Sequence, residues 1–599
     1  MGSKQHLEIA DYVVIGISLF VPLLIGFIFR FTGGRQSTTS EYFLAGRNAS
    51  MFPVIMSISV SVLSAAAIIG LPAEIYRFGS QFILVSFANG VGMFLSSRIF
   101  LPVYFNLNVS SIYEFLEMRF GKWTKYTVSG MFIIQMVLYT SAVLLGPVLA
   151  LSAVTDFSLN IMVILCGTVC TLYCFLGGIK AVLWTDAFQG ILMFLCLITI
   201  YIVGIREVGG LATVYERAKE GDRWEFLNMN FDFTTRFTFW NSNFRGLSLG
   251  LAFYGTNQIQ VQRALAMSSF QRAQTALQWS ILLVVTLLFS CTLFGVVLYA
   301  VYYHCDPILM QSETGIGKYD QLLPYFIVTR LHSVPGLTGL CFAGIFSGSL
   351  STISSALNSL STVTLIDFIK PLFSDRLNPT LELYIAKGLS LVYGIIAIIL
   401  TISITNVDSI AQATIVFLSV AEGPVLAVFL VGVLTRKSSD KCTVISMIVS
   451  VVFISWICFG SLFCGYVYPS LPLDTSECPN KNSTTLFGNS TTSCIDDSNC
   501  VLIEPSEEPF LLYKVAYSWI PTLGCIITIT FIFIGSILTG WNKSVILPDS
   551  KCLSPVVRLR RKGYDYSDTQ CHIDGISLEC ENKLELTKLK DDNLTRHVQ

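Results

Sequence analysis

Long apolar runs are the feature of this sequence that most limits what the chain can fold into. A run of about 20 apolar residues crosses a hydrocarbon core roughly 30 Å thick, and about thirteen such runs lie between Asp11 and Gly540. Only 13% of the residues are charged, against about 25% in soluble domains. These features predict an all-α, multi-pass membrane protein with about 13 transmembrane helices. The expected spans are residues 11–30, 51–75, 80–105, 126–153, 158–179, 182–205, 238–262, 277–303, 336–365, 382–404, 409–434, 441–465 and 512–540.

Positive residues around the spans predict the orientation of the chain. Arg30, Arg35 and Arg47 follow the first span, which places the amino terminus outside the cell and the first loop inside. The first span is too long for a signal peptide, and its positive residues follow it rather than precede it. The alternation of spans then places the later Lys- and Arg-rich loops, including the one expected to begin at Arg263, in the cytoplasm with the tail 541–599.

The polar loop 466–511 falls on the extracellular side in this arrangement. Asn482 and Asn489 each begin an Asn-Ser-Thr glycosylation sequon, so we expect both to be glycosylated. The loop also holds three cysteines whose pairing the sequence leaves open, Cys478, Cys494 and Cys500. Most other cysteines stand singly in apolar runs, where cysteine acts as a small hydrophobic residue. We expect the tail to be solvated and disordered; contact between its basic residues and anionic lipid is the alternative.

Two spans carry clusters of small and polar residues that predict interrupted helices. In the second span, four serines and Gly70 precede Leu71-Pro72, and in the seventh, three glycines precede Thr256-Asn257-Gln258. Five positions separate these spans in the order, as in transporters whose inverted repeats each contribute a broken helix to a site near mid-membrane. The alternative is that the small residues only allow close helix packing.

The sequence contains no motif for hydrolytic or redox chemistry. Its five histidines all lie in loops or tails, and it has no P-loop, no HExxH motif and no cluster of metal ligands. A net charge of -1 does not indicate a nucleic-acid partner. We therefore expect that the protein is not an enzyme, uses no cofactor and does not hydrolyse ATP.

Charged residues inside spans are rare, and they are functional candidates by default. Asp186 lies near the start of the sixth span, with Gln189 near its face at i+3. Its carboxylate can bind a cation, bond to a neighbouring helix or pair with Lys180. Glu422 lies mid-span before Gly423-Pro424, and the sequence leaves open whether it is protonated, paired or facing a cavity.

The stretch FSGSLSTISSALNSLSTVTLID, residues 346–367, carries many hydroxyl groups for a membrane span. On a helix, six of its residues form one polar stripe: Gly348, Ser351, Thr352, Ser355, Ser359 and Thr362. Such hydroxyls often bond to their own i−4 carbonyls or to a neighbouring helix. Because sodium takes oxygen ligands, the first three positions are instead a candidate sodium site, with unpaired carbonyls of the interrupted second span as further ligands.

Four motifs along the chain resemble those of the sodium:solute symporter family. They are LPAEIYRFG at 71–79, GGIKAVLWTD at 177–186, NQIQVQR at 257–263 and SGSLST at 347–352. The resemblance covers about residues 8–540 and points to the branch that holds monocarboxylate, multivitamin and iodide transporters. It implies a LeuT-type core of two inverted five-helix repeats.

The resemblance also implies a division of the chain. Residues 1–50 would form the extracellular amino terminus, the first helix and a cytoplasmic loop, and 51–205 the first repeat. An extracellular loop would follow at 206–237, and the second repeat at 238–434. The last two spans, with the glycosylated loop between them, would occupy 435–540, before the cytoplasmic tail.

By the same resemblance, site residues can be assigned. One sodium site maps to the carbonyls of Val60 and Leu63, a carbonyl near Gly348, and the hydroxyls of Ser351 and Thr352. Iodide-type members add sodium-linked positions at Ser61, Asp186 and Gln189. The substrate would lie beside the two broken helices, near Val62, Ala67, Tyr139, Phe253, Tyr254 and Phe417.

Departures from the family pattern bear on the substrate. Sugar transporters have Asn and His where this chain has Val62 and Ala67, and iodide-type members have Gln at Ala67, so neither substrate is favoured. Glu422 stands where this branch has a small residue. We expect a plasma-membrane symporter that imports sodium with a small organic anion, foremost a monocarboxylate such as lactate, pyruvate or a short-chain fatty acid. The alternatives are biotin, pantothenate or iodide as substrate, or a sodium-dependent conductance or sensor on the same fold.

Overall fold

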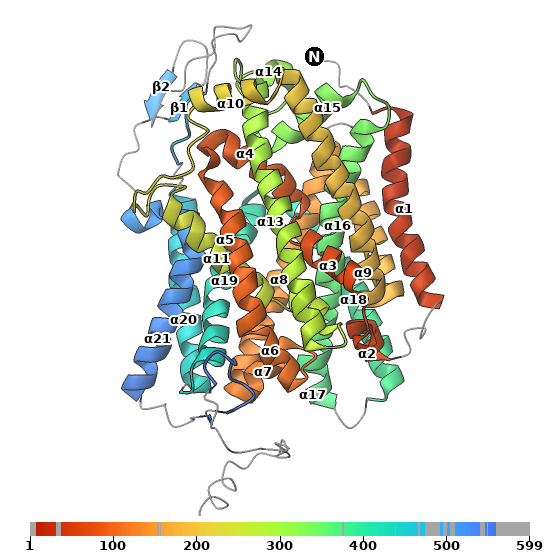
Figure 1. The fold of residues 1–599 in the computed structure, drawn as a ribbon, viewed down its shortest axis with the longest axis vertical. Helices are drawn as coiled ribbons and strands as arrows, with labels where there is room; N and C mark the ends of the chain where they lie inside the picture. Colours follow the sequence, from red (N-terminus) through yellow and green to blue (C-terminus); the bar gives the residue numbers. More distant parts are fainter. Residues whose placement is uncertain are drawn as a thin grey trace, which may run out of the picture. The chain divides into compact units, whose positions relative to one another are not determined.

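The computed structural model describes most of the chain. Its backbone is described for residues 7–31, 38–152, 155, 157–373, 377–405, 408–437, 439–464, 468–473, 491–494, 500–503, 510–539, 546–547 and 549–558. The side chains of residues 150, 312–313, 405, 408–418, 491–494 and 500–503 lie outside this description. Helices dominate, and the described strands are one antiparallel pair, β1 (Thr491–Cys494) and β2 (Cys500–Ile503) (Figure 1).

Most helices follow one another along the chain with short connections; the connections after α10 and after α20 are long. The α-helices are α1 (Ile9–Phe31), α2 (Thr39–Leu44), α3 (Met51–Val60), α4 (Ala65–Phe78), α5 (Leu84–Ile99), α6 (Leu101–Leu107), α7 (Ile112–Arg119), α8 (Lys122–Ser152), α9 (Leu159–Val208), α10 (Leu211–Glu220), α11 (Phe239–Gly255), α12 (Gln258–Leu265), α13 (Phe270–Val301), α14 (Gln311–Thr314), α15 (Leu322–Leu331), α16 (Leu337–Val363), α17 (Lys370–Phe373), α18 (Pro379–Thr405), α19 (Asp408–Leu434), α20 (Asp440–Phe463) and α21 (Ile520–Thr539). The short turns are η1 (Ala45–Arg47), η2 (Ser80–Ile83), η3 (Tyr319–Gln321), η4 (Thr364–Ile369), η5 (Leu511–Lys514) and η6 (Tyr517–Trp519).

Every expected span falls on one of these helices or on a pair of them, and α9 contains two spans. By length and hydropathy, nine helices of the described residues can cross a membrane, or ten if the bent pair formed by residues 39–47 and 51–60 counts as one. This criterion does not reach the expected thirteen, because the halves of the two broken helices are too short for it, α9 is counted once, and α19 enters only as the shorter stretch Ser419–Leu434. The multi-pass helical fold is confirmed, and the number of crossings stays a prediction.

Gly178 explains how two spans share α9. Its backbone has φ 55° and ψ −158°, which bends the helix between the two expected spans. A Cβ at this position would lie 2.7 Å from a ring carbon of Tyr42 and 2.8 Å from its carbonyl oxygen. Because φ is positive and the space is filled, only glycine fits here without strain.

Both predicted interruptions are present. The second span is divided into α3 and α4 at residues 61–64, where the Ser64 side chain caps α4 by accepting from the Ala67 N–H. The seventh span is divided into α11 and α12 at residues 256–257, and the Asn257 side chain caps α12 by accepting from the Ile259 N–H. Each break therefore lies at a residue suited to begin a new helix. Gly70, which was expected to contribute to the break, and Pro72, at which the apolar run was expected to end, instead lie within α4.

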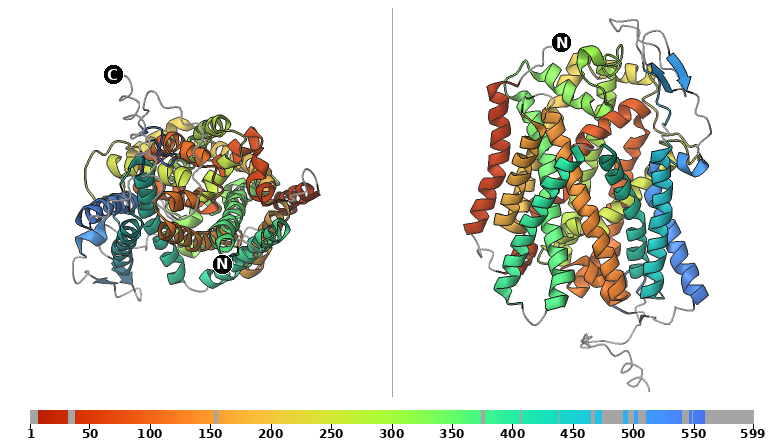
Figure 2. Two further views of the ribbon diagram at one scale, coloured as in Figure 1. Left: turned by 90° about the horizontal axis from the view of Figure 1, so that it is seen from below. Right: turned by 180° about the vertical axis from the view of Figure 1, so that it is seen from behind.

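The span that contains α16 is the most buried of the candidate spans, since 94% of the residues in its most apolar stretch are buried. Figure 2 shows the same helices from below and from behind.

Glycines allow α5 and α11 to pack closely against each other. A Cβ at Gly92 of α5 would lie 2.6 Å from the Leu247 carbonyl of α11, and a Cβ at Gly250 of α11 would collide with the Asn89 carbonyl of α5. Packing through small residues is typical of membrane helices.

The predicted extracellular loop is described in part. Arg223, 0% exposed, donates to the carbonyls of Leu471 and Pro472 and so fixes residues 468–473 beside α4. Cys305, after α13, is disulfide-bonded, which fits an oxidising extracellular side. The sequons at Asn482 and Asn489 and the thiol of Cys478 lie outside the described residues.

The predicted tail begins with a packed segment. The Ser554 N–H donates to the Val433 carbonyl at 2.9 Å, and Leu553 is 1% exposed. Residues 549–558 therefore fold against the end of α19 rather than extending into solvent as expected. Residues 559–599 lie outside the description.

Candidate functional site

The break between α3 and α4 faces α16 at Gly348. A Cβ on Gly348 would lie 2.9 Å from the Leu63 carbonyl oxygen and 3.3 Å from the Ala65 nitrogen. Within the described residues, the Leu63 carbonyl accepts no backbone hydrogen bond, whereas the Val60 carbonyl accepts from the Leu63 N–H at 3.1 Å. The structure thus brings the predicted Leu63 carbonyl against the predicted face of α16, whereas the predicted Val60 carbonyl is already paired.

The two predicted hydroxyls of α16 differ in their bonding. Thr352 Oγ1 donates to the Gly348 carbonyl at 2.9 Å, which is the i−4 bond considered as the alternative, although its lone pairs stay available to a cation. Within the described residues, Ser351 Oγ is buried, makes no hydrogen bond to its own helix, and has the Asp186 carboxylate as the acceptor within its reach. Ser351 is therefore the hydroxyl of the pair that is open to a ligand.

Asp186 is the centre of a buried polar cluster that joins four helices. Its Oδ2 accepts from Ser57 Oγ of α3 and from Arg263 Nη2 of α12, the latter at 3.3 Å. Arg263 Nε donates to Ser57 Oγ at 2.6 Å, and Arg263 Nη2 donates to Ser355 of α16. Asp186 is 0% exposed and Arg263 is 2% exposed. Of the three roles considered for Asp186, the bond to a neighbouring helix is observed, and its cationic partner is Arg263 rather than Lys180.

The prediction that Arg263 lies in a cytoplasmic loop is wrong. Its guanidinium lies inside the protein because α12 turns inward after the break and ends in the Asp186 cluster. Arg263, Ser57 and Gln260 were all missed as site residues. The available signal was the polar NQIQVQR motif directly after a predicted break.

Several oxygens of this region lack partners within the described residues. They are Asp186 Oδ1, Gln189 Oε1, Gln260 Oε1 and Ser351 Oγ. Ser61, the remaining predicted sodium-linked residue, accepts from Gln260 Nε2 at 2.7 Å. Buried oxygens without partners are costly, and a hard cation is the ligand that such oxygens suit. The arrangement is chemically able to hold sodium.

The predicted substrate-adjacent residues lie around the two breaks. Val62, Ala67, Tyr139, Phe253 and Tyr254 all belong to one packed cluster of apolar side chains. Tyr139 of α8 reaches the first break through Ser64, and the rings of Phe253 and Tyr254 are 5.5 Å apart at the end of α11. Tyr254 OH is buried without a partner within the described residues. The side chain of Phe417 lies outside the description.

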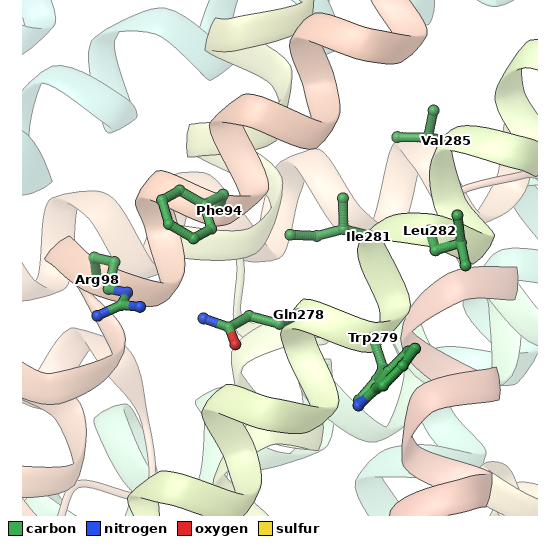
Figure 3. A pocket seen from close by; sticks show the side chains of 7 residues that line it. All are labelled: Phe94, Arg98, Gln278, Trp279, Ile281, Leu282 and Val285. Carbon is green, nitrogen blue, oxygen red and sulfur yellow. The ribbon is translucent and has the colours of Figure 1, made fainter.

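A surface pocket of about 590 Å³ lies away from these residues. Figure 3 shows the side chains that line it, Phe94, Arg98, Gln278, Trp279, Ile281, Leu282 and Val285, on α5 and α13. Trp279 is 60% exposed and Leu282 is 63% exposed, so this pocket opens on the outer, apolar surface. None of the predicted site residues lines it.

Comparison with known proteins identifies the group to which this arrangement belongs. The model of the sodium:solute symporter family matches residues 42–450, which contain both broken helices, α9 and α16. The chain belongs to the sodium:solute symporter family. The predicted family is thus confirmed, and the chain is a multi-pass membrane transporter of the sodium-symporter class.

Individual symporters of this family cover almost the whole chain. A Drosophila melanogaster protein assigned as a sodium-dependent multivitamin transporter is 35% identical over 554 residues, covering 90% of this chain and 89% of that protein. Sodium-coupled monocarboxylate transporter 2 of Bos taurus is 33% identical, covering 91% and 86%. Sodium-coupled monocarboxylate transporter 1 of Homo sapiens is 33% identical, covering 90% and 88%.

A solved symporter structure has the same fold. A Na⁺-coupled sialic acid symporter in a substrate-bound outward-open state superposes with a TM-score of 0.71 at 21% identity, covering 89% of this chain and 98% of that chain. The predicted transporter fold with a LeuT-type core is therefore confirmed.

Proposed function

We propose that the protein is a plasma-membrane symporter that uses sodium to import a small monocarboxylate, such as lactate, pyruvate or a short-chain fatty acid. Family membership supports sodium symport, and two of the relatives compared above are named for sodium-coupled monocarboxylate transport. The observation that carries the proposal is the group of unpartnered oxygens of Ser351, Asp186 and Gln189 beside the broken second span. The amino terminus would face outside and the tail the cytoplasm.

Sodium binding would act by joining mobile parts of the core. An ion held by the carbonyls of Val60 and Leu63 and by Ser351 and Thr352 would tie the α3–α4 break to α16. Such an ion favours the conformation in which its ligands are complete. The binding site would then open in turn to the outside and to the cytoplasm, as the two repeats move around it.

Electrogenic uptake of a monocarboxylate would need at least two sodium ions for each substrate. One sodium that enters across about 70 mV gains about 1.6 kcal/mol, and a tenfold concentration gradient adds about 1.4 kcal/mol. With a monoanion the voltage contribution of one sodium cancels, so a second ion is needed for electrogenic uptake. Ser61, Asp186 and Gln189 are the proposed ligands of that second ion.

Uptake of labelled lactate into expressing cells tests this function. We expect accumulation that requires external sodium and is inhibited by unlabelled pyruvate and butyrate. Current without accumulation would instead identify a conductance or a sensor. Absence of sodium-dependent lactate uptake, with uptake of biotin or pantothenate, would favour the second candidate, which the similarity to a multivitamin transporter supports.

Ser351→Ala is expected to raise the sodium concentration for half-maximal uptake about fivefold or more, because the cation loses one oxygen ligand. Ser347→Ala is the control, since within the described residues Ser347 Oγ bonds only to the Ala343 carbonyl of its own helix, as the donor. Sodium titration of uptake, corrected for surface expression, measures both. An unchanged sodium requirement in Ser351→Ala would exclude this hydroxyl as a ligand.

A further inference from the structure

Two opposite charges inside the membrane region are not used by the proposed ion sites. Arg245 lies on α11, seven positions into the first half of the broken seventh span, and Glu422 lies in the middle of α19. A charged side chain within a span is costly and is a functional candidate by default. These residues therefore need a role of their own.

The packing places both residues at the start of α21. One turn after Arg245, Ser248 Oγ is 3.0 Å from Thr522 Oγ1. Next to Glu422, a Cβ on Gly423 would lie 2.2 Å from the Pro521 carbonyl. Arg245 and Glu422 are thus each within about one helical turn of a residue that contacts the Pro521–Thr522 peptide of α21.

Neither charge is saturated by hydrogen bonds. Arg245 Nη1 and Glu422 Oε1 are buried and have no partner within the described residues. Arg245 contacts the Tyr517 ring, with its guanidinium carbon 5.1 Å from the centroid. Arg236 also lies over the Tyr517 ring, but unlike Arg245 it forms two hydrogen bonds to the Glu74 carboxylate, at 2.9 and 2.7 Å. Arg245 therefore keeps a free donor, and Glu422 keeps a free acceptor.

The open donor and acceptor define the ligand that would satisfy both. A guanidinium suits a carboxylate, to which it can donate two parallel hydrogen bonds. A carboxylate accepts from O–H or N–H. A small carboxylate with a hydroxyl group beside it offers both functions, whereas a plain fatty acid offers only the first.

We propose that Arg245 and Glu422 form a substrate subsite in which Arg245 binds the carboxylate and Glu422 accepts a hydrogen bond from a hydroxyl of the same molecule. This inference rests on the proposed carboxylate transport and narrows it to a preference for 2-hydroxy acids over unsubstituted acids. The subsite lies on helices that carry predicted substrate-adjacent residues, since Phe253 is on α11 and Phe417 is on α19. Substrate would meet it on the way to, or at, the two breaks.

Lactate and propionate form a matched pair for the test because they differ only in the 2-hydroxyl group. In Arg245→Met, we expect the KM for both acids to rise about tenfold or more, since both lose the charged bond. In Glu422→Met, we expect the preference for lactate over propionate to fall about fivefold or more, since only lactate loses a bond. An unchanged lactate-to-propionate ratio in Glu422→Met overturns the role of Glu422.

The double variant Arg245→Met/Glu422→Met separates binding from a structural role. Replacing both members of a buried pair by apolar residues is often neutral for stability. If the pair only stabilises the fold, the double variant regains normal KM values for both acids, and the proposal is wrong. If the pair binds substrate, surface expression recovers but the KM for lactate stays high. Absence of sodium-dependent carboxylate uptake in the unmodified protein would instead reject the proposed function itself.

Discussion

Gly348→Val is expected to abolish sodium-dependent uptake while the protein still reaches the cell surface. A Cβ on Gly348 would lie 2.9 Å from the Leu63 carbonyl and 3.0 Å from Ile68 Cδ1. A valine must therefore displace the α3–α4 break from α16, and the proposed sodium site needs ligands from both sides of this contact. A displacement of about 1 Å can cost about 100-fold in the rate of a process that depends on such geometry, and we expect a loss of uptake of that order.

Gly388→Val is the matched control for this experiment. Gly388 lies in α18, and a Cβ there has no neighbour within 4 Å, so the same substitution adds a β-branched residue to a helix without a clash. We expect nearly normal uptake in this variant. Sodium titration of lactate uptake and surface labelling are measured side by side. A normal sodium requirement in Gly348→Val would remove the contact between Leu63 and Gly348 from the ion site.

The broken helices could be predicted from the sequence because their cause is local. Serines near residue 61 and glycines near residue 255 are poor in helix propensity, and Ser64 and Asn257 are suited to cap the helices that follow. The residue at which the second span breaks could not be predicted from the sequence. Gly70 and Pro72 suggest a break, but neighbouring helices can compensate for such residues in a membrane protein, and α4 continues through them.

The Asp186 cluster could not be predicted, because its members come from distant parts of the chain. Ser57, Asp186, Arg263 and Ser355 meet only when α3, α9, α12 and α16 are packed together. Hydropathy identified Asp186 as unusual but gave no means of choosing its partner. Arg263 even supported the predicted orientation as a loop residue, since position relative to apolar runs says nothing about the direction in which a short helix turns.

The Asp186 and Arg263 pair allows the second prediction with a large effect, because its two single variants should fail differently. In Arg263→Met, the Asp186 carboxylate loses its only cationic partner within the described residues. Breaking a buried pair in this way costs about 3–5 kcal/mol, so we expect loss of surface expression. In Asp186→Asn, the buried Arg263 loses its counter-charge, but the Asn oxygen can still accept its hydrogen bond and Arg263 keeps its bonds to Ser57, Ser355 and the Ile259 carbonyl. We therefore expect reduced but measurable surface expression, without sodium-dependent uptake.

The double variant Asp186→Asn/Arg263→Met then decides what Asp186 does. It leaves no uncompensated buried charge, so surface expression is expected to recover relative to Arg263→Met. Uptake is expected to stay absent, because the carboxylate that would balance a bound cation is missing. Surface labelling, lactate uptake and sodium-dependent thermal stabilisation of the purified protein measure the three properties separately. Recovered uptake would mean that Asp186 serves only as the counter-charge of Arg263, and that the second sodium ion must be bound elsewhere.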